Sequence, residues 1–321
     1  NIINNLNLGY DPKIFTSKNL KNYFSKNNLI PINDNLIDQI FRFKEKTSNP
    51  FYSLKKNIVG ESHNSKILKI VDYLKSNKSD YIFVSAPENV AWLLNIRGYD
   101  NPNSPIPNAR LIIDKNKKIF FIAKKENVKK IINEKKIRKN NFIEIKNLPV
   151  LIKKIKGKNF IIDNRSCSIF YEDIIKSKFK ILNKEDPIYK LKSIKNSYEI
   201  HHMIEAHKKD GLALTKFIYW IKNINKKTIT EVEAQNKLDK FRKLNKDYLF
   251  PSFNTIAGSG SNGAIIHYRA TSKNTKKINK KDILLIDSGG QYKYGTTDVT
   301  RTICFTKQKK SIKNAYTNVL K

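Results

Sequence analysis

The spacing of apolar residues predicts alternating helices and strands from about residue 60 to residue 185. In the stretch 64–77, Ile67, Ile70, Val71 and Leu74 recur at the interval of one helical face. Further helices are expected at 86–98 and 126–135, and short apolar runs predict strands at 81–84, 109–114, 118–123, 142–145 and 158–163. Helices interleaved with strands over this length indicate a self-contained α/β domain, which we place at 46–186.

The segments on either side have different patterns. Residues 1–45 fit a strand, a helix and a strand, as in the tail of a first α/β domain. After a boundary near Asp186 and Pro187, a long amphipathic helix is expected at 197–222 and a second at 231–245, with Thr230 and Glu233 forming a capping box. The expected face of the long helix contains Ile200, Met203, Ile204, His207, Leu214, Phe217, Ile218 and Ile221.

The period then changes to that of strands, which are expected at 248–260, 263–270, 282–287 and 295–305. Residues 187–321 therefore read as an α+β domain that has only begun, and the fold class is multidomain, α/β followed by α+β. The chain begins at Asn1 and ends within the first turns of an expected helix, so we expect a fragment cut at both ends.

Composition adds two exclusions and one ambiguity. The 321 residues contain no apolar run long enough to span a membrane and only two cysteines, which disfavours a disulfide framework and favours a reducing, cytoplasmic location. The formal charge of +35 would suit a polyanionic partner. However, Arg supplies only 8 of the 63 basic residues and the lysines are dispersed, so compositional drift is favoured over specific nucleic-acid or membrane binding.

The chemically most informative stretch is DILLIDSGGQYKYGTTDVTRT, residues 282–302. An apolar strand ends in Asp287, and the return strand carries Asp298. If Tyr292 and Lys293 form a two-residue turn, Asp287 lies directly opposite Asp298 on one face. Two carboxylates that close must share a proton or a cation, so the sequence favours a site for Mn²⁺, with Zn²⁺ or Co²⁺ as alternatives, over a solvated hairpin.

The histidines are weaker signals. His267 follows an apolar run and is expected in or at the end of a buried strand, either as a core histidine or as a group that contacts substrate. His201 and His202 are expected on the helix surface, and His207 is expected to pack. Cys304 is read as a small buried apolar residue.

Taken together, NGAIIHY and, after it, LIDSGGQYKYGTTDVTRT resemble the signature of aminopeptidase P (Xaa-Pro aminopeptidase), in the three-domain form of the pita-bread metallopeptidases. The segments GYDPKIF, VAWLLNIRG and AHKKDGLALTKFIYWI occur in the family's order, so the resemblance covers essentially the whole chain. It implies creatinase-like N-terminal domains at 1–45 and 46–186 and the first part of a pita-bread domain at 187–321.

The resemblance also implies roles for three residues. Asp287 and Asp298 match the first two metal ligands, and His267 matches a catalytic histidine beside the scissile bond. Two metal ions would activate water for attack on peptides with proline at the second position. The family's remaining His and Glu ligands would lie beyond Lys321, so this chain alone is expected to be inactive. A homodimer is possible by analogy.

Two alternatives remain open. One is a related hydrolase of other specificity, such as a prolidase or a creatinase-like enzyme. The other is a pita-bread protein that only binds partners and has no catalytic activity, although such proteins typically lose the metal carboxylates that are intact here.

Overall fold

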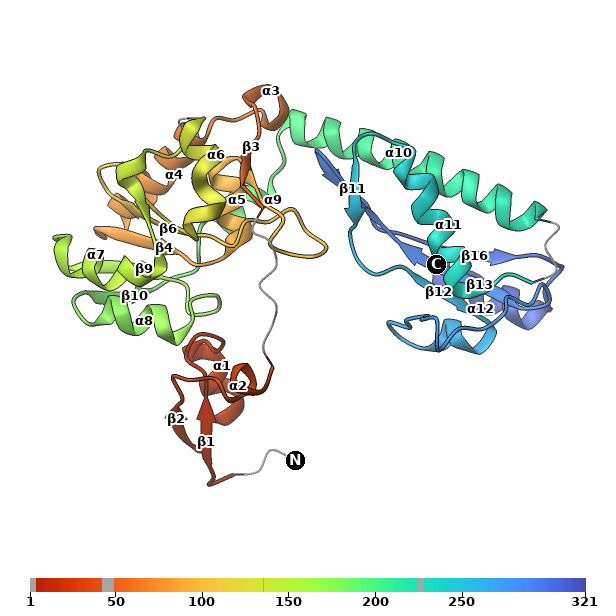
Figure 1. The fold of residues 1–321 in the computed structure, drawn as a ribbon, viewed down its shortest axis with the longest axis horizontal. Coiled ribbons are helices and arrows are strands. Elements are labelled where there is room, and N and C mark those ends of the chain that lie inside the picture. The colour runs from red at the N-terminus through yellow and green to blue at the C-terminus, as the bar shows by residue number, and fades with distance from the viewer. Residues whose placement is uncertain (1–3, 42–48, 135, 225–227) are drawn as a thin grey trace. The chain divides into compact units, whose positions relative to one another are not determined.

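The fold was obtained as a computed structural model that describes residues 4–41, 49–134, 136–224 and 228–321. Contacts between Cα atoms divide the chain into two compact units, Asn1–Asn196 and Ser197–Lys321. Each unit is described by itself, and Figure 1 gives the labels of the elements.

The N-terminal segment has the expected strand, helix and strand. Strands β1 (Asn7–Tyr10) and β2 (Asn28–Pro31) pair in parallel, and helix α1 (Ser17–Phe24) connects them. A short helix α2 (Leu36–Ile40) follows. The amides of Ile169 and Phe170 donate to backbone oxygens of Phe15 and Pro12, which fastens this segment to the rest of the first unit.

A mixed six-stranded sheet forms the centre of the first unit, in the order β10-β9-β4-β6-β7-β8. The pairs β10–β9, β9–β4 and β7–β8 are parallel, whereas β4–β6 and β6–β7 are antiparallel. The strands are β4 (Tyr81–Val84), β6 (Arg110–Asp114), β7 (Ile119–Ile122), β8 (Phe142–Ile143), β9 (Asn159–Ile162) and β10 (Lys180–Asn183). Five of them lie within the apolar runs of the sequence, but β10 was not predicted, because its side chains are half-buried or exposed.

Helices cover both faces of this sheet (Figure 1). On one face lie α4 (His63–Ser76), α5 (Pro87–Leu94) and α6 (Lys125–Asn133), and on the other lie α7 (Leu148–Lys154) and α8 (Ile169–Lys176). Helix α5 ends earlier than expected, because Asn95 takes a left-handed conformation with φ of 53°. The remaining elements are α3 (Lys56–Val59), β3 (Tyr52–Ser53) paired with β5 (Ile96–Arg97), α9 (Ile188–Ser193), and the 3-10 turns Lys139–Asn141 and Ile145–Asn147.

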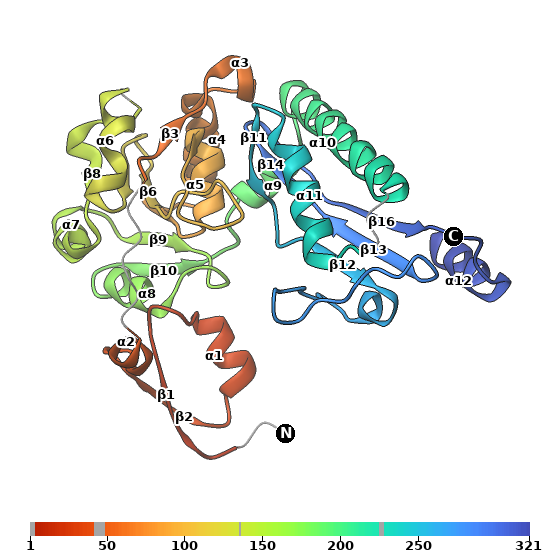
Figure 2. The ribbon, with the colours of Figure 1, turned by 45° about the vertical axis from the view of Figure 1, so that its right-hand side comes forward.

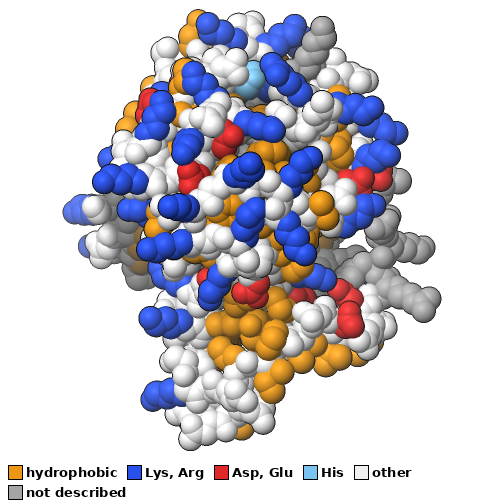
Figure 3. All heavy atoms as spheres, turned by 90° about the vertical axis from the view of Figure 1, so that its left-hand side faces the viewer, with side chains coloured by type: hydrophobic (Ala, Val, Ile, Leu, Met, Phe, Trp, Pro, Cys, Tyr) orange, Lys and Arg blue, Asp and Glu red, His pale blue; other side chains and the backbone are white. Residues whose placement is uncertain are grey.

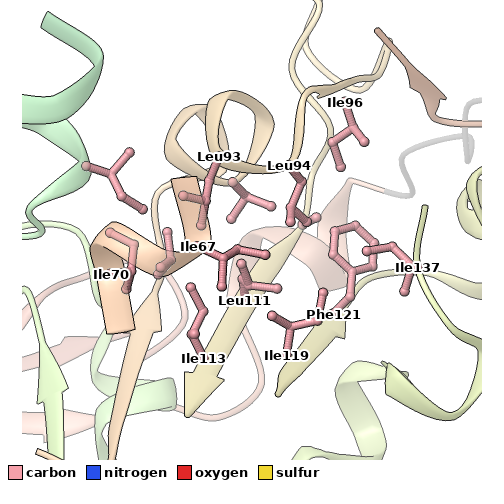
Figure 4. Close-up of a cluster of buried hydrophobic side chains, with 14 of the residues drawn as sticks. Ile67, Ile70, Leu93, Leu94, Ile96, Leu111, Ile113, Ile119, Phe121 and Ile137 are labelled. Carbon is pink, nitrogen blue, oxygen red and sulfur yellow. The ribbon is translucent and has the colours of Figure 1, made fainter. Parts of the chain in front are cut away.

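The larger core of the unit lies between the sheet and α4, α5 and α6. Figure 4 shows Leu111 and Ile113 of β6 beside Phe121 of β7, with Ile67 of α4 and Leu93 of α5 above them. Apart from Ile67, which is 5% exposed, these side chains are fully buried. Burial of such side chains contributes ~1.5–3 kcal/mol each, so this cluster holds the unit together.

The surface matches the dispersed charge of the sequence. Figure 3 shows Lys and Arg spread over one face of the molecule, with Asp and Glu between them and no single basic stripe on that face. Within the described residues, no helix combines the length and the apolar character that crossing a bilayer requires.

The second unit begins with two packed helices, α10 (Ser197–Asn223) and α11 (Glu231–Lys243), and both were predicted. Figure 2 shows them lying along the strands of this unit. The strands form two antiparallel sheets, β11-β14-β15 and β12-β13-β16. Their bounds, with the last helix, are β11 (Tyr248–Pro251), β12 (Ile256–Ser259), β13 (Ile283–Ser288), β14 (Gly290–Tyr292), β15 (Gly295–Thr296), β16 (Val299–Cys304) and α12 (Lys310–Leu320).

The buried face of α10 differs in part from the expected one. Leu214, Phe217 and Ile221 are buried as predicted. The N-terminal part of the expected face is exposed, and the face instead continues through small and polar residues. The exposed members are Ile200, Met203, Ile204 and His207, and the buried ones are Ala206, Asp210 and Ala213. The prediction failed because apolar spacing cannot register a buried aspartate that is paired with an arginine far along the chain.

Candidate metal and substrate site

Asp287 lies near the end of β13, on the half-buried face of the strand. Leu284, Ile286 and Ser288 are buried, whereas Asp287 alternates with them and is only half-buried. Its Oδ1 accepts a hydrogen bond of 2.8 Å from Oγ1 of Thr300 on β16. The strand therefore holds a carboxylate that is reachable from solvent at the edge of an apolar interior.

The predicted register of the hairpin is wrong by two residues. Asp287 lies opposite Thr300, not opposite Asp298. The two-residue turn consists of Lys293 and Tyr294, because Tyr292 remains in its strand and pairs with Gly295. Tyr292 is held there by its buried hydroxyl, which donates to Asp210 at 3.0 Å.

Asp298 is exposed and immediately precedes β16. The residue before it is fixed: Thr297 is buried, its amide donates to Gly290 O at 3.0 Å, and its Oγ1 accepts from Gly290 N at 2.9 Å. A register shift of two residues preserves the face of a strand. Asp298 itself lies outside β16, two residues before Thr300, so its position on the face of Asp287 stays a prediction.

Gly289 joins β13 to β14 at a point where three segments converge. Its carbonyl accepts from the amide of Ser252, and Oγ of Ser252 donates to the carbonyl of Thr297 at 2.8 Å. A Cβ at Gly289 would lie 2.0 Å from Thr297 O and 2.2 Å from Ser252 Oγ. Only glycine lets these backbones approach so closely beside the two aspartates.

A buried ion pair between Arg242 and Asp210 contacts the end of β13. Arg242 of α11 donates from Nε to Oδ1 of Asp210 at 2.6 Å and from Nη2 to Oδ2 at 3.1 Å, and Nη2 also donates to Ser288 Oγ at 3.0 Å. The arginine and aspartate side chains are 1% and 0% exposed. Burial and the neighbouring Asp210 raise the pKa of Tyr292, which keeps its hydroxyl a donor. Neither Arg242 nor Asp210 was predicted from the sequence to have a role, although an apolar helix face interrupted by one aspartate was a signal.

His267 is not in a strand, so that prediction is wrong. Residues Gly260–Ala264 form a 3-10 turn instead, and His267 follows it as an exposed residue with φ of 54°. Gly258 and Gly263 pack backbone to backbone, since a Cβ at Gly258 would lie 2.8 Å from Gly263 Cα. This contact folds the segment back on β12 and prevents a continuous strand.

The other histidines and Cys304 differ in part from the sequence-based expectations in their exposure. His201 and His207 are exposed, so the expected packing of His207 is wrong, and Nδ1 of His207 lies 2.9 Å from Met203 O. His202 is half-buried, which lowers its pKa. Cys304 is half-buried rather than buried. In the first unit, burial and the nearby Lys136 lower the pKa of His63 to about 4.

Asp287 and Asp298 are the two carboxylates that the sequence predicts as metal ligands. No cluster of three or more His, Cys, Asp or Glu that could hold an ion occurs among the described residues. Carboxylate and hydroxyl oxygens are hard donors of the kind that Mn²⁺ or Mg²⁺ accepts. The chemical type of these oxygen ligands is therefore suitable for a divalent cation. Further ligands are needed to complete its coordination.

Comparisons with known proteins agree with this picture. Residues 43–199 match the Creatinase/Prolidase N-terminal domain, and residues 201–321 match Metallopeptidase family M24. The chain is 34% identical over 303 residues to Xaa-Pro aminopeptidase ApepP of Drosophila melanogaster, covering 91% of this chain and 49% of that protein. It is 32% identical over 305 residues to Xaa-Pro aminopeptidase 1 of Dictyostelium discoideum, covering 90% and 48%.

Among solved structures, the fold is similar to an X-prolyl aminopeptidase of Caenorhabditis elegans described as a cytosolic enzyme with a di-nuclear active site. The TM-score is 0.85 at 24% identity, covering 96% of this chain and 53% of that one. An Xaa-Pro dipeptidase of Bacillus anthracis superposes with a TM-score of 0.63 at 20% identity, covering 81% and 70%. The chain spans about half the length of the curated relatives it matches.

Proposed function

Because residues 43–199 belong to the creatinase/prolidase N-terminal domain family and residues 201–321 to metallopeptidase family M24, we propose that the complete protein is a metal-dependent Xaa-Pro aminopeptidase. It hydrolyses the bond between an N-terminal residue and a following proline. The observation that carries this proposal is the 34% identity to an Xaa-Pro aminopeptidase over 91% of the chain. The two intact aspartates at the β13–β16 hairpin are consistent with it.

Asp287 and Asp298 are the residues that would hold two divalent ions, with Mn²⁺ favoured and Zn²⁺ or Co²⁺ as alternatives. When bound, such ions act as Lewis acids and lower the pKa of water, so that hydrolysis proceeds at neutral pH. Thr300 keeps Asp287 in place through the hydrogen bond to Oδ1. Arg242 does the same for the backbone of β13 through Ser288.

His267 would act on the substrate rather than on the metal. Its imidazole is exposed, so it is free to donate a hydrogen bond to the peptide carbonyl or to the oxyanion that forms on attack. The exposure of His267 argues against the other interpretation of the sequence, in which this residue is a buried core histidine.

For the whole protein we propose three parts: the tail of a first creatinase-like domain at 1–45, a second at 46–186, and the start of the pita-bread domain at 187–321. A cytosolic location and a homodimer are proposed by analogy, and the first of these follows the description of the Caenorhabditis elegans structure. Specific binding to nucleic acid or membrane is not proposed, because Arg supplies only 8 of the 63 basic residues and the lysines are dispersed along the sequence.

The test compares variants of the complete protein on a peptide that begins Xaa-Pro, with manganese added. Asp298→Ala should abolish turnover and reduce bound metal, whereas His267→Ala should lower turnover by ~10²–10⁴-fold and leave metal content intact. Asp72→Ala, at an exposed aspartate of α4, is the matched control and should behave as wild type. Unchanged cleavage by Asp298→Ala would refute the site.

Two further measurements separate the alternatives. Cleavage of free Xaa-Pro dipeptides in preference to longer peptides would identify a prolidase, and lack of any hydrolysis by the complete protein would favour a binding role. Residues 1–321 alone should bind metal weakly, because two carboxylates leave an ion largely hydrated.

A further inference from the structure

Glu231 is a fully buried carboxylate in the first turn of α11. Its Oε1 accepts from the amide of Ser259 at 2.8 Å and from Nδ2 of Asn262 at 3.0 Å. Its Oε2 accepts from the hydroxyl of Tyr268 and from the amide of Lys276, each at 2.8 Å. A buried carboxylate is costly without partners, so this saturation by donors is what makes Glu231 tolerable at this position.

All four donors belong to the connection between β12 and β13. Ser259 ends β12, Lys276 lies on the return path, and Asn262 and Tyr268 lie between them. Asn262 also donates to the Tyr268 hydroxyl at 2.8 Å, so the side chains of Glu231, Asn262 and Tyr268 form a closed triangle. One carboxylate thus fixes the start, the middle and the return of a connection that contains little regular structure.

His267 lies inside this connection, directly before Tyr268. Its left-handed backbone costs of order 1–3 kcal/mol for a residue with a side chain and persists only where the surroundings impose it. Tyr268 is 5% exposed while His267 is exposed, so anchoring the tyrosine inward leaves the imidazole facing outward. Burial and the hydrogen bond to Glu231 raise the pKa of Tyr268 to about 12, which keeps the anchoring hydroxyl protonated.

We propose that Glu231 is a positioning residue that, through Tyr268 and Asn262, holds His267 in the conformation in which it contacts the substrate. This inference rests on the proposed function, since it assigns Glu231 a role in the same reaction. Protein groups donate to both carboxylate oxygens of Glu231, so the proposed role requires no contact with substrate or metal. The effect of Glu231 on turnover therefore passes through His267.

In Glu231→Gln, one carboxylate oxygen, which accepts hydrogen bonds, is replaced by an NH₂ group, which donates them. At least one of the four protein donors then faces this NH₂ group and loses its acceptor. In the complete protein the variant should lower kcat by ~10²-fold, as a misplaced catalytic group does, with a smaller change in KM and unchanged metal content. In a His267→Ala background the same change should lower kcat by no more than about threefold, because residues that act as a unit are not additive.

A second variant guards against misfolding of Glu231→Gln. Tyr268→Phe removes one donor and should lower kcat by about tenfold, the equivalent of one hydrogen bond. The matched control Glu205→Gln makes the same chemical change at a carboxylate of α10 that pairs with Lys208 at the surface, and it should leave kcat unchanged. Hydrogen exchange at the amides of Ser259 and Lys276 should accelerate in Glu231→Gln and not in Glu205→Gln.

The outcomes separate the two proposals. If the wild-type complete protein does not cleave Xaa-Pro peptides, the proposed function fails, and unchanged exchange at Ser259 and Lys276 would also remove the anchoring role. If the wild type cleaves and both variants retain wild-type kcat, the inference is overturned. The inference is also overturned if Glu231→Gln lowers kcat by the same ~10²-fold in the His267→Ala background, because the effect would then not pass through His267.

Discussion

In the α/β domain of the first unit, β4 and β7 are buried along their whole length, and apolar side chains cover both faces of the sheet. In the second unit, β13 alternates buried with half-buried residues, and the interior beside it includes charged side chains. Arg242 and Asp210 form an ion pair there, and Glu231 accepts hydrogen bonds from four protein groups. Apolar burial has no direction, whereas each polar contact has a required partner and geometry.

The two kinds of interior should tolerate substitutions differently. An apolar core loses stability in proportion to the volume removed. A polar interior fails when one partner is lost, because the other is left buried and unsatisfied. The chain has two tryptophans, Trp92 in the first unit and Trp220 in the second. Fluorescence in a Trp92→Phe or Trp220→Phe background therefore reports on one unit at a time.

The largest stability effect is expected at the ion pair of the second unit. Arg242→Ala removes the guanidinium that pairs with the buried Asp210, to which the Tyr292 hydroxyl still donates, and should cost ~3–5 kcal/mol. Urea unfolding followed through Trp220 measures this loss. Arg301→Ala, at an exposed arginine of β16, is the control and should stay within about 0.5 kcal/mol. Equal costs at both positions would mean that burial is not the cause.

A comparable truncation in the first unit should cost ~2–5 kcal/mol, depending on how far the site collapses. Leu111→Ala removes a fully buried side chain from the cluster of Figure 4. Leu68→Ala on α4, where the side chain is 40% exposed, provides the control and should change little. Unfolding followed through Trp92 should show the loss in the first unit alone.

The first unit also contains a carboxyl whose stability contribution depends on pH. Burial raises the pKa of Asp186 to about 6, against hydrogen bonds from Asn89 and the Ile188 amide that lower it. Between about pH 4 and 6 the folded state therefore binds the proton more tightly than the unfolded state, so stability falls as pH rises through that window. At about 1.4 kcal/mol per unit of pKa, the decline amounts to a few kcal/mol.

Asp186→Asn should flatten this slope, and unfolding midpoints of the first unit at pH 4, 5 and 6 measure it. Asp72→Asn, at an exposed residue of α4, should keep the slope. The neighbouring Asp163 acts in the opposite sense. Its pKa is lowered despite burial by hydrogen bonds from Arg165 and the Asp186 amide, so its contribution is lost only at lower pH. A slope that survives in Asp186→Asn would contradict the assignment.

The smallest effect should be equal in the two units. Thr230 caps α11 by accepting from the amide of Glu233, and Ser62 caps α4 by accepting from the amide of Ser65. Loss of either cap costs ~1 kcal/mol, since a cap is a local contact that does not depend on the kind of core nearby. Thr230→Ala and Ser62→Ala, each measured in its own unit, should therefore agree within experimental error.

The same contrast explains which elements the sequence could predict. In the sheet of the first unit, the runs at 81–84 and 118–123 were found because burial on both faces leaves a continuous apolar run. Helices α10 and α11 were found from apolar spacing and the capping box of Thr230. The family was found from a local motif around Asp287 and Asp298.

What failed depended on partners distant in sequence. His267 was expected in a strand, but the donors to Glu231 and the glycine contact at Gly258 fold that segment otherwise. The hairpin register was missed because Tyr292 is held in its strand by Asp210, 82 residues away. No periodicity in a sequence records such pairs.

The close approach at Gly289 has a consequence for how the gene can vary. Any missense change of a glycine codon adds at least a Cβ, and here that atom would lie 2.0 Å from the Thr297 carbonyl oxygen. Relief would require the backbone beside Asp287 and Asp298 to move, not merely a side chain. We therefore expect no neutral amino-acid substitution at Gly289. Substitutions at Lys293 and Tyr294, which form an exposed turn, should be tolerated.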